Sequence, residues 1–140
     1  MSINTAATGN SFFDIKMGTA GAFFLGAIVF AVNYAHGWQL ALVAASKQGL
    51  YTFIIGGVMT KMTENIAIRI GQRRKALLMA VLIPTLLTSL LTFGMHSLKG
   101  TPEPFISTLP TFVFAPVGFY GWALRKRKQF DSLKTADLTN

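Results

Sequence analysis

Four long stretches of this chain contain no charged residue, and that feature constrains the fold more than any other. Asp, Glu, Lys and Arg are all missing from residues 17–46, 48–60, 76–98 and 104–124. About 20 apolar residues in a helix cross the ~30 Å hydrocarbon layer of a bilayer. A soluble domain of 140 residues has no interior large enough to hide four such stretches. The sequence therefore predicts an all-α integral membrane protein.

The stretches predict four transmembrane helices arranged as two hairpins, at residues 17–35, 39–60, 76–95 and 105–124. Because the second of these contains Lys47, a competing frame places that span at residues 48–68, with residues 38–47 on the outer interface. The competing frame buries Lys61 and Glu64, which lie one turn apart and are able to pair. Burying one off-centre Lys costs less than burying two charges, which favours the first frame.

The remaining parts of the chain are polar or basic. Residues 1–16 form a polar N-terminal segment before the transmembrane domain of residues 17–124. Within that domain, residues 61–75 are basic, and Met62, Ile66 and Ile70 recur every four residues, which predicts a helix on the membrane surface. Residues 125–140 form a basic tail that we expect to be disordered.

Proline interrupts the third span at Pro84 and removes one backbone donor there. The hydroxyls of Thr85, Thr88 and Ser89 follow at once, and we expect them to satisfy the carbonyl that Pro84 leaves free.

Basic residues predict the orientation. With both termini inside, eleven lysines and arginines flank the inner ends of the spans, whereas Lys99 alone lies outside. We therefore expect cytoplasmic termini, in a plasma membrane such as a bacterial inner membrane. The net charge of +8 then reflects orientation and contact with anionic lipid rather than nucleic-acid binding. The residues expected to contact anionic lipid are Arg125, Lys126, Arg127 and Lys128.

Small residues recur every four positions in the first two spans. Such rows let two helices approach closely, which stabilises helix pairs in lipid. The predicted packing faces are Gly18, Ala22 and Gly26 on one helix and Ala41, Ala45 and Gly49 on the next.

Two segments of the chain resemble each other at a spacing of 59 residues. Residues 50–58 and 109–117 are identical at four of nine positions, and the same spacing relates Lys16 to Lys75. One interpretation is a tandem repeat of two parallel hairpins. The other is chance similarity between apolar helices, and the sequence leaves both open.

Lys47 is the only charge inside the spans of the favoured frame. A charge at the bilayer centre costs ~2.5–3.5 kcal/mol on insertion scales, so the presence of Lys47 within a span needs an explanation. One reason is a ligand-binding or partner-binding site formed with Ser46 and Gln48, and the other is a side chain that snorkels to water. His36 and His96 lie at outer span ends and are secondary candidates for binding haem or a pigment.

Catalytic chemistry finds no support in the sequence. The five acids form no pair within a span, and the chain has no cysteine for a thiolate metal site. We therefore expect no enzyme, no metal site and no cofactor. The favoured function is an accessory or scaffold subunit of a larger membrane complex, in contact with other membrane subunits or with further copies. The alternative is a small oligomeric transporter or channel that uses Lys47.

Overall fold

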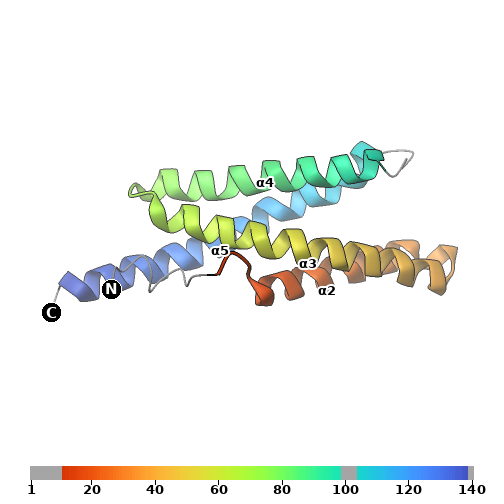
Figure 1. Ribbon diagram of the computed structural model, residues 1–140, viewed down its shortest axis with the longest axis horizontal. Coiled ribbons are helices and arrows are strands. Elements are labelled where there is room, and N and C mark those ends of the chain that lie inside the picture. The colour runs from red at the N-terminus through yellow and green to blue at the C-terminus, as the bar shows by residue number, and fades with distance from the viewer. Residues whose placement is uncertain (1–10, 99–103, 139–140) are drawn as a thin grey trace. The chain divides into compact units, whose positions relative to one another are not determined.

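The computed structural model describes residues 11–98 and 104–138, and nearly all of them are helical. The elements are α2 (Ile15–Asn33), the 3-10 turn η1 (Tyr34–His36), α3 (Trp38–Arg69), α4 (Arg73–Leu98) and α5 (Pro104–Leu138) (Figure 1). Three segments, Ile15–His36, Trp38–Arg69 and Arg73–Leu98, are long and apolar enough to cross a membrane. The all-helical prediction is confirmed, and the length and composition of these three helices fit a membrane protein.

Helix α2 begins and ends at residues that satisfy its free backbone groups. The Asp14 carboxylate accepts a hydrogen bond from the Met17 N–H at 3.0 Å, as an N-cap should. At the other end, the Asn33 amide donates to the Val29 carbonyl at 2.8 Å. Gly37 then has φ +106°, a conformation that L side chains rarely adopt. This glycine provides the turn that leads into α3.

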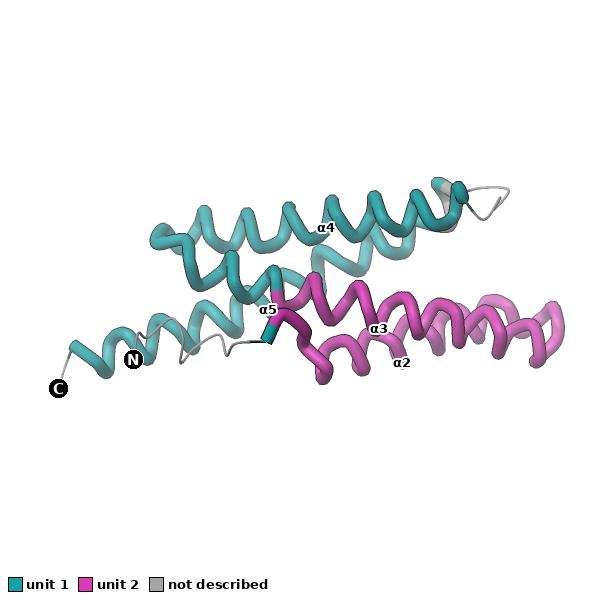
Figure 2. Tube along the Cα trace, in the orientation of Figure 1, with its two compact units in different colours: residues 1–11, 62–140 teal, residues 12–61 magenta. Residues whose placement is uncertain are grey.

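The chain divides into two compact units, which Figure 2 shows in different colours. Unit 2 comprises Phe12–Lys61 and contains α2, η1 and most of α3. Unit 1 comprises residues 1–11 and 62–140, and its described part contains the end of α3, all of α4 and all of α5.

The predicted helix over residues 61–75 is confirmed except at residues 70–72, but it is not a separate element. Residues 61–69 continue α3, and the chain breaks only at residues 70–72 before α4 begins at Arg73. The physical reason is that neither Gly nor Pro occurs between Val58 and Ile70. At 32 residues, α3 is about 48 Å long, which exceeds the hydrocarbon thickness and contains both frames considered for the second span.

The expected disorder of the C-terminal tail is also wrong, because α5 stays helical through Leu138. Residues 122–138 contain neither Gly nor Pro. An ion pair between Arg127 Nε and Asp131 Oδ1, one turn apart at 3.0 Å, adds support on the helix surface. The basic run is therefore the middle of a helix and not its end.

Three helices of unit 1 meet at alanines. Ala67 of α3, Ala80 of α4 and Ala123 of α5 are fully buried and form one cluster, with Ile66 and Leu77 packed around it. Because alanine side chains are small, the helix backbones approach one another closely. On α4 the buried positions follow a four-residue row comprising Ala76, Ala80, Pro84, Thr88 and Thr92, with Thr85 beside it.

Candidate functional site

The small-residue rows of α2 and α3 face each other in unit 2. A Cβ atom added to Gly18 would lie 2.8 Å from the Phe53 carbonyl oxygen and 3.4 Å from Gly57 Cα. Further along, a Cβ atom on Gly26 would lie 3.4 Å from the Ala45 carbonyl oxygen. Backbone therefore packs directly on backbone, in the antiparallel sense expected for a hairpin.

The other members of the predicted rows lie in or beside the same contact. A Cβ atom on Gly49 would be 3.5 Å from the Ala22 carbonyl oxygen. Ala41, nearest the start of α3, is fully buried. These residues thus bring α2 and α3 together, because their side chains are absent or no larger than a methyl group.

An aromatic anchor that the sequence analysis missed closes the other end of this hairpin. The Phe13 ring lies over Gly57, where its atoms would clash with any added Cβ, and meets the Phe53 ring edge-on at 5.1 Å. The Asp14 N–H also donates to the Gly57 carbonyl at 3.0 Å. The pair Phe12-Phe13 directly before the N-cap was the available signal, since apolar residues there often anchor a helix start.

Ser46, Lys47 and Gln48 lie on the part of α3 that belongs to unit 2. Ser46 and Lys47 are both exposed on α3. The Gln48 amide donates to the Thr52 hydroxyl at 3.0 Å, so its hydrogen bond stays on its own helix. Lys47 is therefore open to whatever surrounds α3, whether lipid, water or another chain.

The two histidines lie in different units. His36 is exposed in η1, and His96 is partly buried in the last turn of α4. Among residues 11–98 and 104–138, no group of three or more His, Cys, Asp or Glu lies close enough together to hold a metal ion.

Arg127, in unit 1, makes four side-chain hydrogen bonds. Its guanidinium donates to the carbonyls of Ala67 at 3.0 Å, Ile70 at 2.5 Å and Gly71 at 2.8 Å. Its Nε donates to Asp131 at 3.0 Å. The last carbonyls of a helix have no partner within that helix, so Arg127 caps the C-terminus of α3 from α5.

A buried ion pair lies one turn from this cap. Lys126 Nζ is 3.0 Å from Glu64 Oε2, and Glu64 is only 1% exposed. The same ammonium lies 5.0 Å from the centre of the Trp122 ring. Because an isolated carboxylate is costly to bury, the Lys126 ammonium offsets part of the cost of burying Glu64.

Contact of residues 125–128 with anionic lipid stays a prediction, and two of the four residues, Lys126 and Arg127, have partners within the protein. Arg125 and Lys128 are exposed, whereas Arg127 is 6% exposed and its donors are used within the protein. The end of α3 offers carbonyls within reach of Arg127 and a carboxylate within reach of Lys126.

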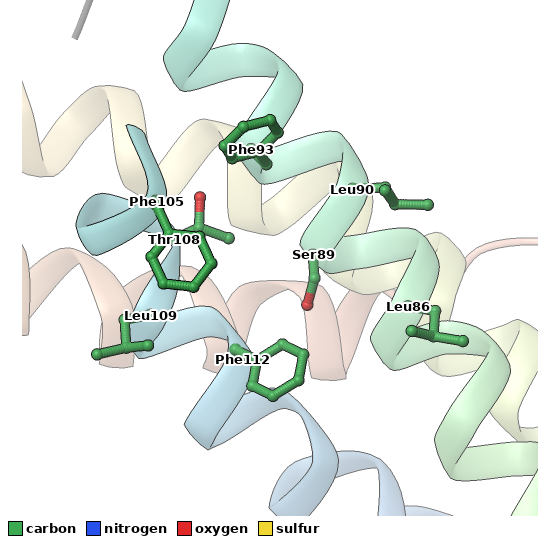
Figure 3. A pocket seen from close by; sticks show the side chains of 8 residues that line it. All are labelled: Leu86, Ser89, Leu90, Phe93, Phe105, Thr108, Leu109 and Phe112. Carbon is green, nitrogen blue, oxygen red and sulfur yellow. The ribbon is translucent and has the colours of Figure 1, made fainter. Parts of the chain in front are cut away.

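A groove of about 480 Å³ runs between α4 and α5 in unit 1 (Figure 3). Ser89 and Phe93 line it from α4, and the remaining α4 residues of its wall are leucines. From α5 come Phe105, Thr108 and Phe112, together with Leu109. The groove is thus a carbon-lined space with two hydroxyls, at the end of the hairpin distant from Arg127.

The hydroxyls after Pro84 are not used as the sequence analysis expected. Thr85 Oγ1, Thr88 Oγ1 and Ser89 Oγ are buried, and none has a hydrogen-bond partner among the described residues. They lie on the packed side of α4 and do not turn back to the carbonyl that Pro84 leaves free. Ser89 is the one of the three that lines the groove, and Figure 3 shows its oxygen directed toward the space in front of Phe112.

Comparison with known proteins finds no matching protein family, no matching curated protein and no matching solved structure. The described side chains offer two kinds of chemistry. The charged residues of unit 1 hold helix ends together, and the groove offers an apolar space with hydroxyls. Neither supplies a nucleophile and base in one place.

Proposed function

We propose that this chain is an accessory or scaffold subunit of a larger membrane complex. The observation that carries the proposal is that charged side chains of unit 1 bind other parts of the same chain. Glu64, Lys126 and Arg127 join the end of α3 to α5 within the protein. Their role is architectural, and together with the alanine cluster that joins α3, α4 and α5 they make unit 1 a braced framework.

The surface of that framework suits contact with other membrane helices. Large apolar side chains are exposed along all four helices, among them Phe24, Leu50, Leu90, Val117 and Tyr120. In a bilayer such residues meet either lipid or another subunit, and close packing decides between the two.

Extraction in a mild detergent followed by native mass spectrometry tests this proposal. We expect the tagged chain to be released with at least one other membrane subunit at a fixed stoichiometry. Deleting the chain should lower the abundance of that same subunit, because a scaffold stabilises what it binds. An unrelated membrane protein with the same tag is the control. Release as a single chain, with no subunit lost on deletion, would contradict the proposal.

A second candidate is a small oligomeric transporter or channel, and the exposure of Lys47 on α3 favours it. Lys47→Leu and Lys47→Arg in the same preparation separate the two functions. A scaffold in which Lys47 only snorkels should keep its subunits in both variants. A transporter should lose its transport activity in the Lys47→Leu variant and keep part of it in the Lys47→Arg variant, because only Arg retains the charge.

For the membrane arrangement we propose four spans in two hairpins, with α5 as the fourth span. The protein would lie in the plasma membrane with both termini in the cytoplasm. The excess of basic residues at the proposed inner ends supports this, and exposed Arg125 and Lys128 are placed to meet anionic lipid. A reporter after Asn140 should read cytoplasmic, and one inserted at Gly100 should read external. Cytoplasmic readings at both positions would leave α5 outside the membrane.

A further inference from the structure

The groove between α4 and α5 contains a polar atom that the protein leaves unsatisfied. Ser89 Oγ is buried and has no hydrogen-bond partner among the described residues, and it lines the groove. A hydroxyl buried without a partner costs free energy, so native proteins usually pair it with protein, water or ligand. The groove is walled almost entirely by carbon, which leaves little to hold a water molecule there.

Three aromatic rings give this space a definite shape. Phe93 lines it from α4, and Phe105 and Phe112 line it from α5 (Figure 3). Aromatic side chains pack on flat rings by offset stacking or edge-to-face contact. A volume of about 480 Å³ lies within the usual range for small-molecule sites.

From these features we infer that the groove binds a membrane-dissolved molecule with a flat, carbonyl-bearing ring, of the quinone class. The Ser89 hydroxyl donates a hydrogen bond to one ring carbonyl. The phenylalanines hold the faces and edges of the ring, and the leucines hold its apolar substituents. The site is separate from the braced end of unit 1 and does not depend on the proposed scaffold function.

The depth of Ser89 in the membrane distinguishes a ring carbonyl from a phospholipid acyl chain as the occupant of the groove. Ser89 precedes the end of α4 at Leu98 by nine residues, or about 13 Å along the helix axis. With α4 spanning the bilayer, that depth lies within the hydrocarbon and below the ester carbonyls of a phospholipid. An acyl chain filling the groove would leave the hydroxyl unpaired, whereas a ring carbonyl pairs it.

Equilibrium binding in nanodiscs of saturated phosphatidylcholine tests the inference with two radiolabelled probes, decyl-1,4-benzoquinone and decylbenzene. Binding is measured as the excess over nanodiscs without protein. We expect the quinone to bind about tenfold more tightly than decylbenzene, which is the upper range for one hydrogen bond. Ser89→Ala should remove most of this preference, and Ser89→Thr, which keeps a hydroxyl, should retain part of it.

Ser97→Ala is the matched control, because Ser97 is exposed on the same helix and outside the groove. It should keep the full preference. Far-ultraviolet circular dichroism confirms that each variant is folded before binding is compared. Equal binding of the two probes to the parent protein would show that the groove is a slot for acyl chains. An unchanged preference in Ser89→Ala would show that the hydroxyl does not contact the ligand, and either result overturns the inference.

Discussion

Replacing Arg127 with Met should lower the free energy of unfolding by about 3 kcal/mol or more. The variant leaves the carbonyls of Ala67, Ile70 and Gly71 without their donor, and the hydrogen bond to Ala67 is buried while the other two are partly buried. Hydrogen bonds from charged donors contribute ~1.5–3 kcal/mol each, and the three are not additive because one group makes them all. Unfolding of the purified protein in mixed micelles, followed by circular dichroism, measures the change.

Arg125→Met is the matched control for that experiment. Arg125 belongs to the same basic run and helix but is exposed, so its loss should change stability by less than about 0.5 kcal/mol. Arg127→Lys should recover only part of the stability, because a single ammonium does not reach three carbonyls in the fork geometry of a guanidinium. Equal stability of the Arg127→Met and Arg125→Met variants would show that the cap does not stabilise unit 1.

Gly18→Ala should destabilise the hairpin of unit 2 by about 1–3 kcal/mol, the range for a methyl group forced into a packed interior. The added methyl would lie 2.8 Å from the Phe53 carbonyl oxygen, and a backbone atom in a helix has little freedom to move aside. The two helices must separate, and the contacts at Gly26 and Gly49 weaken with them. Thermal unfolding in nanodiscs measures the loss.

Gly118→Ala makes the same chemical change where the structure leaves room. An added Cβ atom on Gly118 meets nothing within 4 Å among the described residues. Because alanine favours helix by up to ~1 kcal/mol over glycine, this variant should be neutral or slightly stabilised. If both variants lost the same stability, the cause would be general to glycine in these helices and not the close approach of α2 and α3.

The two units are held together by different physical means. In unit 2, glycine and alanine let backbones touch, and dispersion over the contact stabilises the pair. In unit 1, an alanine cluster is combined with a charged cap and a buried ion pair. Substitutions that add side-chain volume should therefore weaken the helix contact of unit 2. Substitutions that remove charge should weaken the contacts of unit 1.

Local sequence determined the helices and the membrane class. Charge-free stretches of 20 or so residues need helix to satisfy their backbone groups in lipid, and no tertiary contact is required for that conclusion. The glycine and alanine rows of α2 and α3 were also readable, because a four-residue period places them on one helix face and Gly37 turns the chain back. Each of these features depends on residues close together in the chain.

Tertiary structure alone decided what the basic run and the hydroxyls do. Arg127 finds its acceptors 56 to 60 residues earlier, and no local pattern distinguishes it from exposed Arg125. That contact attaches α5 to the end of α3. Ser89 likewise became a candidate ligand contact only when α5 placed phenylalanines opposite it and left its oxygen unpaired. A side chain's partner depends on which distant backbone reaches it, and hydropathy carries no information about that.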